Sequence, residues 1–318
     1  MVQPFSGPVE EQELIRLLNP ANSSDDCALI EHGGQPYLYT TDSLAEGTHF
    51  RMDWSSPEDI AWKLLHVNLS DLLAAGGEPE FCLCNLGLPS VEDGFVHRFA
   101  DALNALLEEQ RISLVGGDTF RCATAFFSLT LSGPALQPRF RRAMAGDDLY
   151  VSGTLGGSRT GYDWLKKNGM PEDRQSEFVD GNGQGTIPLN AIRRHLRPTA
   201  PMAAARQLNA MQENGFPIHG AMDVSDGIFA DCLRFAQSAG LSLEVNLDQL
   251  PLHPQCSGEA RYAASSGEEL ELLIASSAAL PDGFVRIGKF GDSKDSKCSF
   301  LLHGERVEPE GGFEHFSS

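Results

Sequence analysis

Apolar residues recur along the chain with a helical period in some segments and with a strand period in others. The clearest helical pattern covers residues 57–75, with Pro57 in its first turn and Gly76-Gly77 just after its end. Weaker patterns of the same kind predict helices over residues 10–18, 91–110, 201–214 and 228–239, and one more that ends near residue 168.

Short apolar runs between turn-forming residues predict strands. We expect strands over residues 27–31, 35–41, 81–88, 113–115, 125–132, 148–152, 243–245, 272–275, 284–288 and 299–302. Because helices and strands mix in both halves of the chain, the pattern indicates an α/β or α+β fold.

At 318 residues the chain is longer than a usual single domain. Residues 134–146 are rich in Pro, Arg and Gly, so we expect an amino-terminal domain over residues 1–138 and a carboxyl-terminal domain over residues 139–318. Residues 170–186 are polar and glycine-containing, and we expect a mobile loop there. Since neither a strand precedes these glycines nor a helix follows them, they do not predict a dinucleotide site.

The net charge of the chain limits the classes of molecule that it can bind. A formal net charge of −20 repels nucleic acid and anionic membranes, so we expect neither as a partner. An acidic protein can still bind a polyphosphate if divalent cations stand between the carboxylates and the phosphates. We expect no transmembrane helix and no signal peptide, because there is no long apolar run and no basic, then apolar, amino terminus. The odd number of cysteines, 7, indicates reduced thiols and a cytoplasmic protein.

The predicted helix over residues 57–75 carries an aspartate where an apolar residue is expected. Ile60, Leu64 and Val67 form one stripe, and Asp71 continues it. A second, polar stripe consists of Asp59, Lys63, His66 and Ser70. A buried carboxylate costs several kcal/mol unless a cation or hydrogen-bond donors compensate it. We favour a metal ligand at Asp71, with a core aspartate bonded to backbone amides as the alternative.

Oxygen-bearing side chains also stand at the ends of predicted strands. Thr40 and Asp42 share one face of the strand over residues 35–41, with Thr41 on the opposite face, and their oxygens suit Mg²⁺. A strand end that leads into a turn has the same sequence. Asp25 and Asp26 precede the first strand, where two adjacent carboxylates suit either a cation or a solvated turn.

Two glycine-containing motifs follow predicted strands. Gly116-Gly117-Asp118-Thr119 permits close approach of the backbone to a ligand, but alone it predicts a tight turn. Asp223 and Ser225 share a strand face, and Asp226-Gly227 leads into the helix over residues 228–239, whose first amides favour anions. Asp226 could instead be the N-cap of that helix.

Five separated acidic clusters exceed what a purely structural role needs. Several carboxylates around Mg²⁺ ions that also bind substrate phosphates would account for them. Because the sequence has no Gly-x-x-x-x-Gly-Lys-Ser/Thr motif, we expect metal ions rather than a P-loop lysine to hold the phosphates.

In chain order, these motifs resemble those of the thiamine-monophosphate kinase family, within the aminoimidazole-ribonucleotide-synthetase-like superfamily. The matching segments span nearly the whole chain and are Ser-Asp-Asp-Cys-Ala-Leu (24–29), Thr-Asp-Ser-Leu-Ala-Glu-Gly-Thr-His-Phe (41–50), Val-Asn-Leu-Ser-Asp-Leu (67–72), Gly-Gly-Asp-Thr (116–119), Asp-Val-Ser-Asp-Gly (223–227), Ser-Gly-Glu-Glu (266–269) and Gly-Phe-Glu-His-Phe (312–316).

The resemblance implies ATP-dependent phosphorylation of thiamine monophosphate to thiamine diphosphate by direct in-line transfer, assisted by several Mg²⁺ ions. The residues that it implies for metal binding are Asp26, Thr40, Thr41, Asp42, Asp71, Asp118, Asp223 and Asp226. Those that it implies as central to catalysis are Asp42, Asp71, Asp118 and Asp223. Those implied to contact ATP are Gly117, Asp118 and Ser225, and those implied to contact thiamine monophosphate are His49, Glu268 and Phe313. It also implies a two-domain protomer that forms a homodimer through its amino-terminal sheets.

The chain departs from the family pattern at three places. Ser24 stands where the family has Gly, and Glu269 stands where it has Asp. Phe140 takes the place of an ATP-contacting arginine, so Arg141 is our candidate for this contact and Arg139 is the alternative. The nearest rival function is another ATP-using enzyme of the same superfamily. The departures also leave open a non-catalytic protein that senses ATP or thiamine phosphates.

Overall fold

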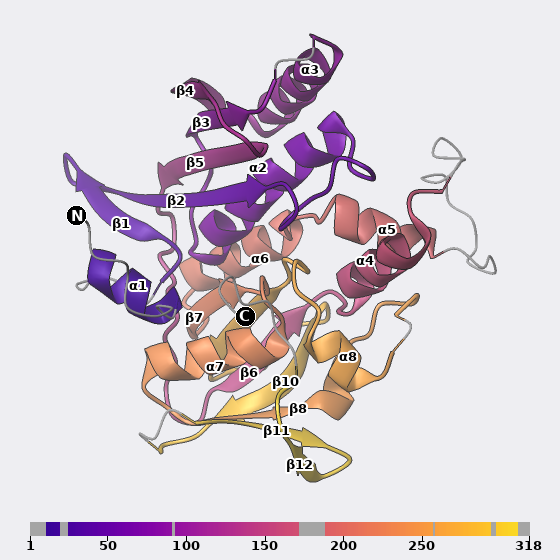
Figure 1. Ribbon diagram of the computed structural model, residues 1–318. Helices are drawn as coiled ribbons and strands as arrows, with labels where there is room; N and C mark the ends of the chain where they lie inside the picture. The colour runs from indigo at the N-terminus through magenta and orange to yellow at the C-terminus, as the bar shows by residue number, and fades with distance from the viewer. Residues whose placement is uncertain are drawn as a thin grey trace, which may run out of the picture.

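A computed structural model describes residues 11–19, 25–90, 93–171, 188–256, 258–293 and 297–310. Two sheets, one in each half of the chain, organise these residues (Figure 1). The first sheet has the strand order β1-β2-β5-β3-β4. Its strands are β1 (Ala28–His32), β2 (Gln35–Ala45), β3 (Phe81–Leu88), β4 (Ser113–Arg121) and β5 (Phe126–Pro134). Strands β3 and β4 are parallel because helix α3 (Asp93–Gln110) connects them.

The second sheet has the strand order β12-β11-β8-β10-β6-β9-β7. Its strands are β6 (Asp148–Ser152), β7 (Ile218–Asp223), β8 (Leu243–Asn246), β9 (Leu272–Ser276), β10 (Phe284–Phe290), β11 (Cys298–Leu302) and β12 (Glu305–Val307). Strand β7 pairs antiparallel with β9, and its last residue, Asp223, lies opposite Leu272. The mixture of antiparallel and parallel pairs in both sheets confirms the predicted mixed α/β class.

Helix α2 (Pro57–Ala74) lies between the two sheets (Figure 1). It packs against β2 and β5 on one side, and against β7 and α6 (Met202–Glu213) on the other. One hydrophobic core therefore runs from the first sheet through α2 into the second sheet, and includes Leu64, Phe127 and Ile274. A second core lies under α7 (Ile228–Ala239). The other helices are α1 (Glu11–Leu18), α4 (Gly157–Asn168), α5 (Leu189–Leu196), α8 (Ala260–Ala264) and the 3-10 helix η1 (Leu247–Gln249).

Helix α2 begins with a capping box, which explains its sharp start. Ser56 Oγ accepts the N–H of Asp59 at 3.2 Å, and Asp59 Oδ2 accepts the N–H of Ser56 at 2.8 Å. The polar stripe of this helix is buried like the apolar stripe. Its partners in the second half of the chain are Arg197 for Asp59, Glu268 for Lys63, Ala200 for His66 and Asp223 for Ser70. Both faces of α2 are therefore interior.

Most predicted elements are present within a few residues of their expected bounds, but several details differ. Helices α5 and α8, the 3-10 helix η1 and strand β12 were not predicted, and β4 extends six residues beyond the predicted strand over residues 113–115. The tight turn predicted at Gly116-Gly117-Asp118-Thr119 is wrong, because these residues pair with β3 inside β4. The register shifts where Val115 is inserted between the paired residues Leu114 and Gly116.

The change from the first sheet to the second falls between β5 and β6. The domain division at residue 138 stays a prediction. The predicted loop over residues 170–186 lies mostly outside the described residues. Among the described helices, none combines the length and the apolar character needed to cross a membrane.

Candidate active site

A cavity of about 840 Å³ is lined by residues from both halves of the chain. This volume is within the range of small-molecule sites. The residues of the sequence-based prediction that line it are Asp26, Asp42, His49, Asp71, Arg141, Asp223, Ser225, Asp226 and Glu268. Most of the predicted site residues therefore converge, although they are spread over more than 200 positions of the chain.

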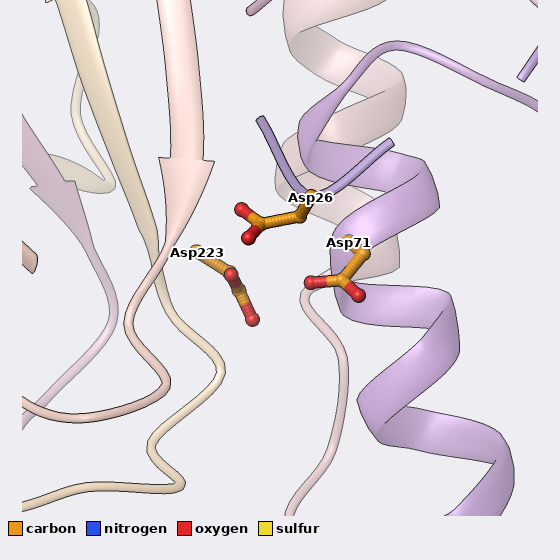
Figure 2. A group of neighbouring side chains, drawn as sticks. All are labelled: Asp26, Asp71 and Asp223. Carbon is orange, nitrogen blue, oxygen red and sulfur yellow. The ribbon is translucent and has the colours of Figure 1, made fainter. Parts of the chain in front are cut away.

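Three aspartates from separate segments form an acidic cluster in this cavity. Figure 2 shows the carboxylates of Asp26, Asp71 and Asp223 pointing toward one another. Asp26 precedes β1, Asp71 belongs to α2 and Asp223 ends β7. One oxygen of each carboxylate lies within 4.8 Å of the others. Oxygen atoms grouped in this way match the preference of Mg²⁺.

Hydroxyl groups hold two of these carboxylates in place without neutralising them. Thr40 Oγ1 donates to Asp71 Oδ2 at 2.8 Å, and Ser70 Oγ donates to Asp223 Oδ2 at 2.5 Å. Burial, and then the neighbouring carboxylates Asp42 and Asp223, raise the pKa of Asp71 well above its usual value. Burial, and then Asp26, raise the pKa of Asp223 to about 8. The cluster thus has the excess of negative charge that a cation site requires.

Asp42 extends the cluster from β2. Its N–H donates to Asn68 Oδ1 at 2.9 Å, which fixes the strand against α2. Partial burial, and then Asp26 and Asp226, raise the pKa of Asp42 to about 6. Thr41 lies on the other face of β2, where its hydroxyl donates to the Leu129 carbonyl at 3.2 Å. The structure therefore does not bring Thr41 to the cluster.

The two candidate arginines have different surroundings. Arg141 lines the cavity, where its guanidinium contacts the Asp26 carboxylate. The backbone N–H of Arg141 donates to Asp25 Oδ1 at 2.8 Å. Arg139 is buried and donates to backbone carbonyls at the end of α2 and to Asn209 Oδ1 of α6. Burial lowers the pKa of Arg139 to about 10. Arg139 joins two helices, whereas Arg141 can reach a ligand.

A carboxylate of α7 that the sequence analysis missed holds the turn after β7. Asp231 is fully buried and its Oδ2 accepts the N–H groups of Ser225, Asp226 and Gly227 at 3.0–3.1 Å. Arg234 contacts both Asp226 and Asp231, and it lines the cavity. Asp226 is therefore not the residue that caps α7. The spacing of Asp231 and Arg234 on one helix face was the available signal.

A second group of side chains surrounds Glu268, which lines the cavity. Glu268 Oε2 accepts from Lys63 Nζ at 2.8 Å and lies 3.6 Å from His195 Nδ1. His49 Nδ1 accepts the N–H of Ala45 at 3.1 Å, which leaves the hydrogen of a neutral ring on Nε2. The sequence analysis missed Lys63 and His195. The position of Lys63 on the polar stripe of α2 was its signal.

Glu269 has a different role from its neighbour Glu268. It is fully buried, and its Oε1 accepts the N–H groups of Gly156 and Ser158 at 2.8 and 3.0 Å. Its other oxygen pairs with Arg194 Nε at 3.1 Å. The departure from the family's Asp therefore falls at a position that holds the start of α4.

Some predicted site residues do not reach the cavity in this chain. Gly117 and Asp118 lie on β4, which is exposed along its length, and neither lines the cavity. The space that Gly117 leaves is filled by the Cys84 carbonyl of β3, which would lie 1.7 Å from a Cβ atom. The close approach is therefore to a neighbouring strand. Phe313 and Ser24 lie outside the described residues.

Comparison with known proteins agrees with this geometry. Residues 24–135 match the family model described as AIR synthase related protein, N-terminal domain. The thiamine-monophosphate kinase of Leptospira interrogans serogroup Icterohaemorrhagiae serovar Lai is 35% identical over 97% of this chain and 98% of the relative. That of Aquifex aeolicus is 32% identical over 92% of each chain.

A solved structure described as "AaThiL complexed with AMPPCP and TMP" superposes with a TM-score of 0.82. It is 30% identical in sequence and the match covers 98% of this chain and 100% of that one. Likeness of this extent, together with the motifs and the acidic cluster, identifies the chain as a member of the thiamine-monophosphate kinase family, a family of phosphotransferases.

Proposed function

We propose that this protein transfers the γ-phosphoryl group of ATP to thiamine monophosphate and so forms thiamine diphosphate. The observation that carries the proposal is the cluster of Asp26, Asp71 and Asp223 in a cavity that also contains Arg141 and Arg234. Carboxylates attract a triphosphate only through divalent cations, and arginines bind phosphate oxygens directly. The solved relative in complex with AMPPCP and TMP supports the same pair of substrates.

The residues around the cluster fit Mg²⁺, because they offer oxygen atoms and carry charges that repel one another. Those that would hold the ions are Asp26, Thr40, Asp42, Asp71, Asp223 and Asp226. Bound there, Mg²⁺ supplies partial neutralisation of the negative charge on both reacting phosphates.

The chain needs no strong general base for this reaction. A phosphate monoester has a second pKa of about 6, so its oxygen is already ionised at neutral pH. We propose that this oxygen attacks the γ-phosphorus in line, and that the bond from phosphorus to the ADP oxygen breaks as the new bond forms. Arg141 and Arg234 orient the phosphates, while His49 and Glu268 hold the thiamine end.

The assignment of Arg141 to ATP has a matched control in Arg139. Arg141→Met should raise the KM for ATP about tenfold or more, because a charge-assisted contact is lost. Arg139→Met should instead lower the melting temperature, because buried acceptors at the end of α2 lose their donor. Steady-state kinetics and thermal melting of both variants test this. An unchanged KM for ATP in Arg141→Met would remove Arg141 from the nucleotide site.

We also propose that two chains pair through their amino-terminal sheets. Strand β4 is an edge strand and exposes Leu114, Val115 and Phe120 by 46, 60 and 46%. An exposed apolar edge strand is a template for pairing. Such pairing would place Asp118 of β4 at the interface between the two chains. Asp118, which the family resemblance implies as a metal ligand, could reach an active site from there. Sedimentation velocity should give about twice the chain mass of 34.5 kDa, and a single-chain mass would contradict the proposal.

The decisive assay follows ADP release. Purified protein with ATP and Mg²⁺ should release ADP when thiamine monophosphate is added, and should not respond to unphosphorylated thiamine. Chelation of the divalent ions should abolish the reaction. Binding of thiamine monophosphate without ADP release would indicate a sensor. ADP release with neither compound as acceptor would indicate another enzyme of the superfamily.

A further inference from the structure

We infer that Lys63 is a positioning residue for the thiamine end of the cavity, and that it acts through Glu268 and His49. This inference rests on the proposed function, in which these two residues bind thiamine monophosphate. Lys63 itself is 3% exposed and does not line the cavity. It therefore affects a ligand only through the groups that it holds.

The Lys63 ammonium joins three segments that are far apart in sequence. Its Nζ donates to Glu268 Oε2 at 2.8 Å and to the His49 carbonyl at 3.0 Å. A buried ammonium is costly unless it is paired, so this geometry is strongly specified. Helix α2 thus fixes the loop after β2, which carries His49, and the loop before β9, which carries Glu268.

The backbone of Glu268 is held independently of Lys63, so Lys63 acts on the side chain. Glu268 has a φ of +54°, a left-handed conformation that non-glycine residues adopt at a cost. Its N–H donates to the Ser225 carbonyl at 2.6 Å, which ties the loop to the turn after β7. The side chain would be free to rotate about this anchored backbone without the ammonium. Lys63 selects the rotamer that lines the cavity.

The charges around Glu268 favour a ligand with N–H donors. Oε2 accepts from Lys63, so we assign the ligand to the other carboxylate oxygen, Oε1. Burial, and then Lys63, hold the pKa of His195 well below its usual value, so this ring stays neutral. The site offers one anchored carboxylate oxygen, which matches the amino group of the thiamine pyrimidine. An anchored carboxylate binds such a group more tightly than a mobile one.

The nucleotide region lies elsewhere on the same helix. Asp71 follows Lys63 by eight positions, which is about 12 Å along an α-helix. Loss of Lys63 should therefore weaken the binding of thiamine monophosphate and leave nucleotide binding nearly unchanged. A purely structural role would weaken both ligands alike.

The chain offers a matched control on the same helix. Asp59 stands one turn before Lys63 and pairs with Arg197 at 2.6 Å, again across the two halves of the chain. Neither Asp59 nor Arg197 lines the cavity. Arg197→Met should therefore lower the melting temperature without changing either affinity.

The experiment compares Lys63→Met, Lys63→Arg and Arg197→Met with the wild type. Isothermal titration calorimetry measures thiamine monophosphate, and separately AMPPCP with Mg²⁺. For Lys63→Met we expect a Kd for thiamine monophosphate raised by about 10- to 100-fold, the range for loss of the charged hydrogen bond that Glu268 makes with the ligand. The Kd for AMPPCP should change less than about twofold, and Lys63→Arg should restore part of the loss.

A double-mutant cycle separates action through Glu268 from a general effect. If Lys63 acts mainly through Glu268, the Lys63→Met substitution should have a clearly smaller effect in a Glu268→Gln background, where only its contact with the His49 carbonyl remains. Additive losses, or equal losses for both ligands, would overturn the inference. If Lys63→Met does not fold, the two Kd values are compared in Lys63→Arg instead. A Kd raised for thiamine monophosphate but not for AMPPCP would support the inference, and equal losses would overturn it. A wild type that does not bind thiamine monophosphate would overturn the proposed function as well, whereas normal binding by Lys63→Met would overturn the inference alone.

Discussion

Two groups of buried carboxylates lie in this molecule, and they differ in how their charge is balanced. Asp71 and Asp223 are surrounded mainly by hydroxyls and by other carboxylates. Glu269 and Glu271 are bound to Arg194, and Ser152 Oγ donates to Glu271 Oε2 at 2.7 Å. Both groups are buried near the contact between the two halves of the chain.

The difference separates a structural role from a ligand-binding role. Glu269 and Glu271 pair with a cation of the protein, and backbone amides complete the hydrogen bonding of Glu269, so these carboxylates have their partners without a ligand. Among its described partners, the aspartate cluster has Arg141 beside Asp26 as its cation, which fits the proposed binding of Mg²⁺. A buried acid is thus informative about function when its positive partner is missing from the protein.

The largest effect should come from removing Arg194, the cation that pairs with Glu269 and Glu271. Arg194→Met leaves two buried carboxylates without their positive partner, so we expect a loss of about 3–5 kcal/mol in the free energy of unfolding. Urea denaturation of the purified variant measures this loss. A loss below about 1 kcal/mol would mean that Glu269 and Glu271 do not depend on Arg194.

The converse substitution removes a charge from the cluster of Asp26, Asp71 and Asp223. Asp71→Asn should lower turnover at least about a hundredfold, equivalent to about 2.7 kcal/mol in the barrier. Without Mg²⁺ its melting temperature should equal or exceed that of the wild type, because one repelling charge is gone. Kinetics at saturating Mg²⁺ and thermal melting provide the measurements.

A surface aspartate supplies the control for this substitution. Asp101→Asn on the exposed face of α3 should change neither turnover nor melting temperature. Near-normal turnover of Asp71→Asn would exclude Asp71 from metal binding. A large drop in its stability would mean that Asp71 has a structural role, like Glu269 and Glu271.

His66 represents a third case, in which a buried ionisable side chain stays uncharged. Burial lowers the pKa of His66 from 6.5 to about 4, and its Nδ1 accepts the Ala200 N–H at 3.2 Å. Because the folded pKa is the lower one, stability is complete above pH 6.5 and falls as the pH drops toward 4. We expect a loss of about 2 kcal/mol by pH 5.

The pH dependence of urea denaturation, compared between the wild type and His66→Gln, measures the contribution of this histidine. The difference between the two proteins should shrink by that amount between pH 7 and pH 5. A constant difference over this range would show that folding does not lower the pKa of His66.

The sequence predicted the acidic cluster better than its surroundings. Asp71 was detectable because it interrupts an apolar stripe, and Asp223 because a strand and a helix meet there. Lys63 and Asp59 were harder to interpret, since helical periodicity shows that a face is polar but not that another part of the chain covers it. Glu268 and Glu269 are adjacent in sequence, and only the fold shows that one faces the cavity and the other holds α4.

The polar stripe of α2 has a consequence for protein engineering. Four of its side chains are matched one by one to partners in the second half of the chain. A chimaera that joins residues up to β5 with the remaining portion of a distant relative would place these side chains against foreign neighbours. Transplanting α2 together with the segments that carry its partners would keep these four contacts. Helix α2 and those segments should therefore be exchanged together.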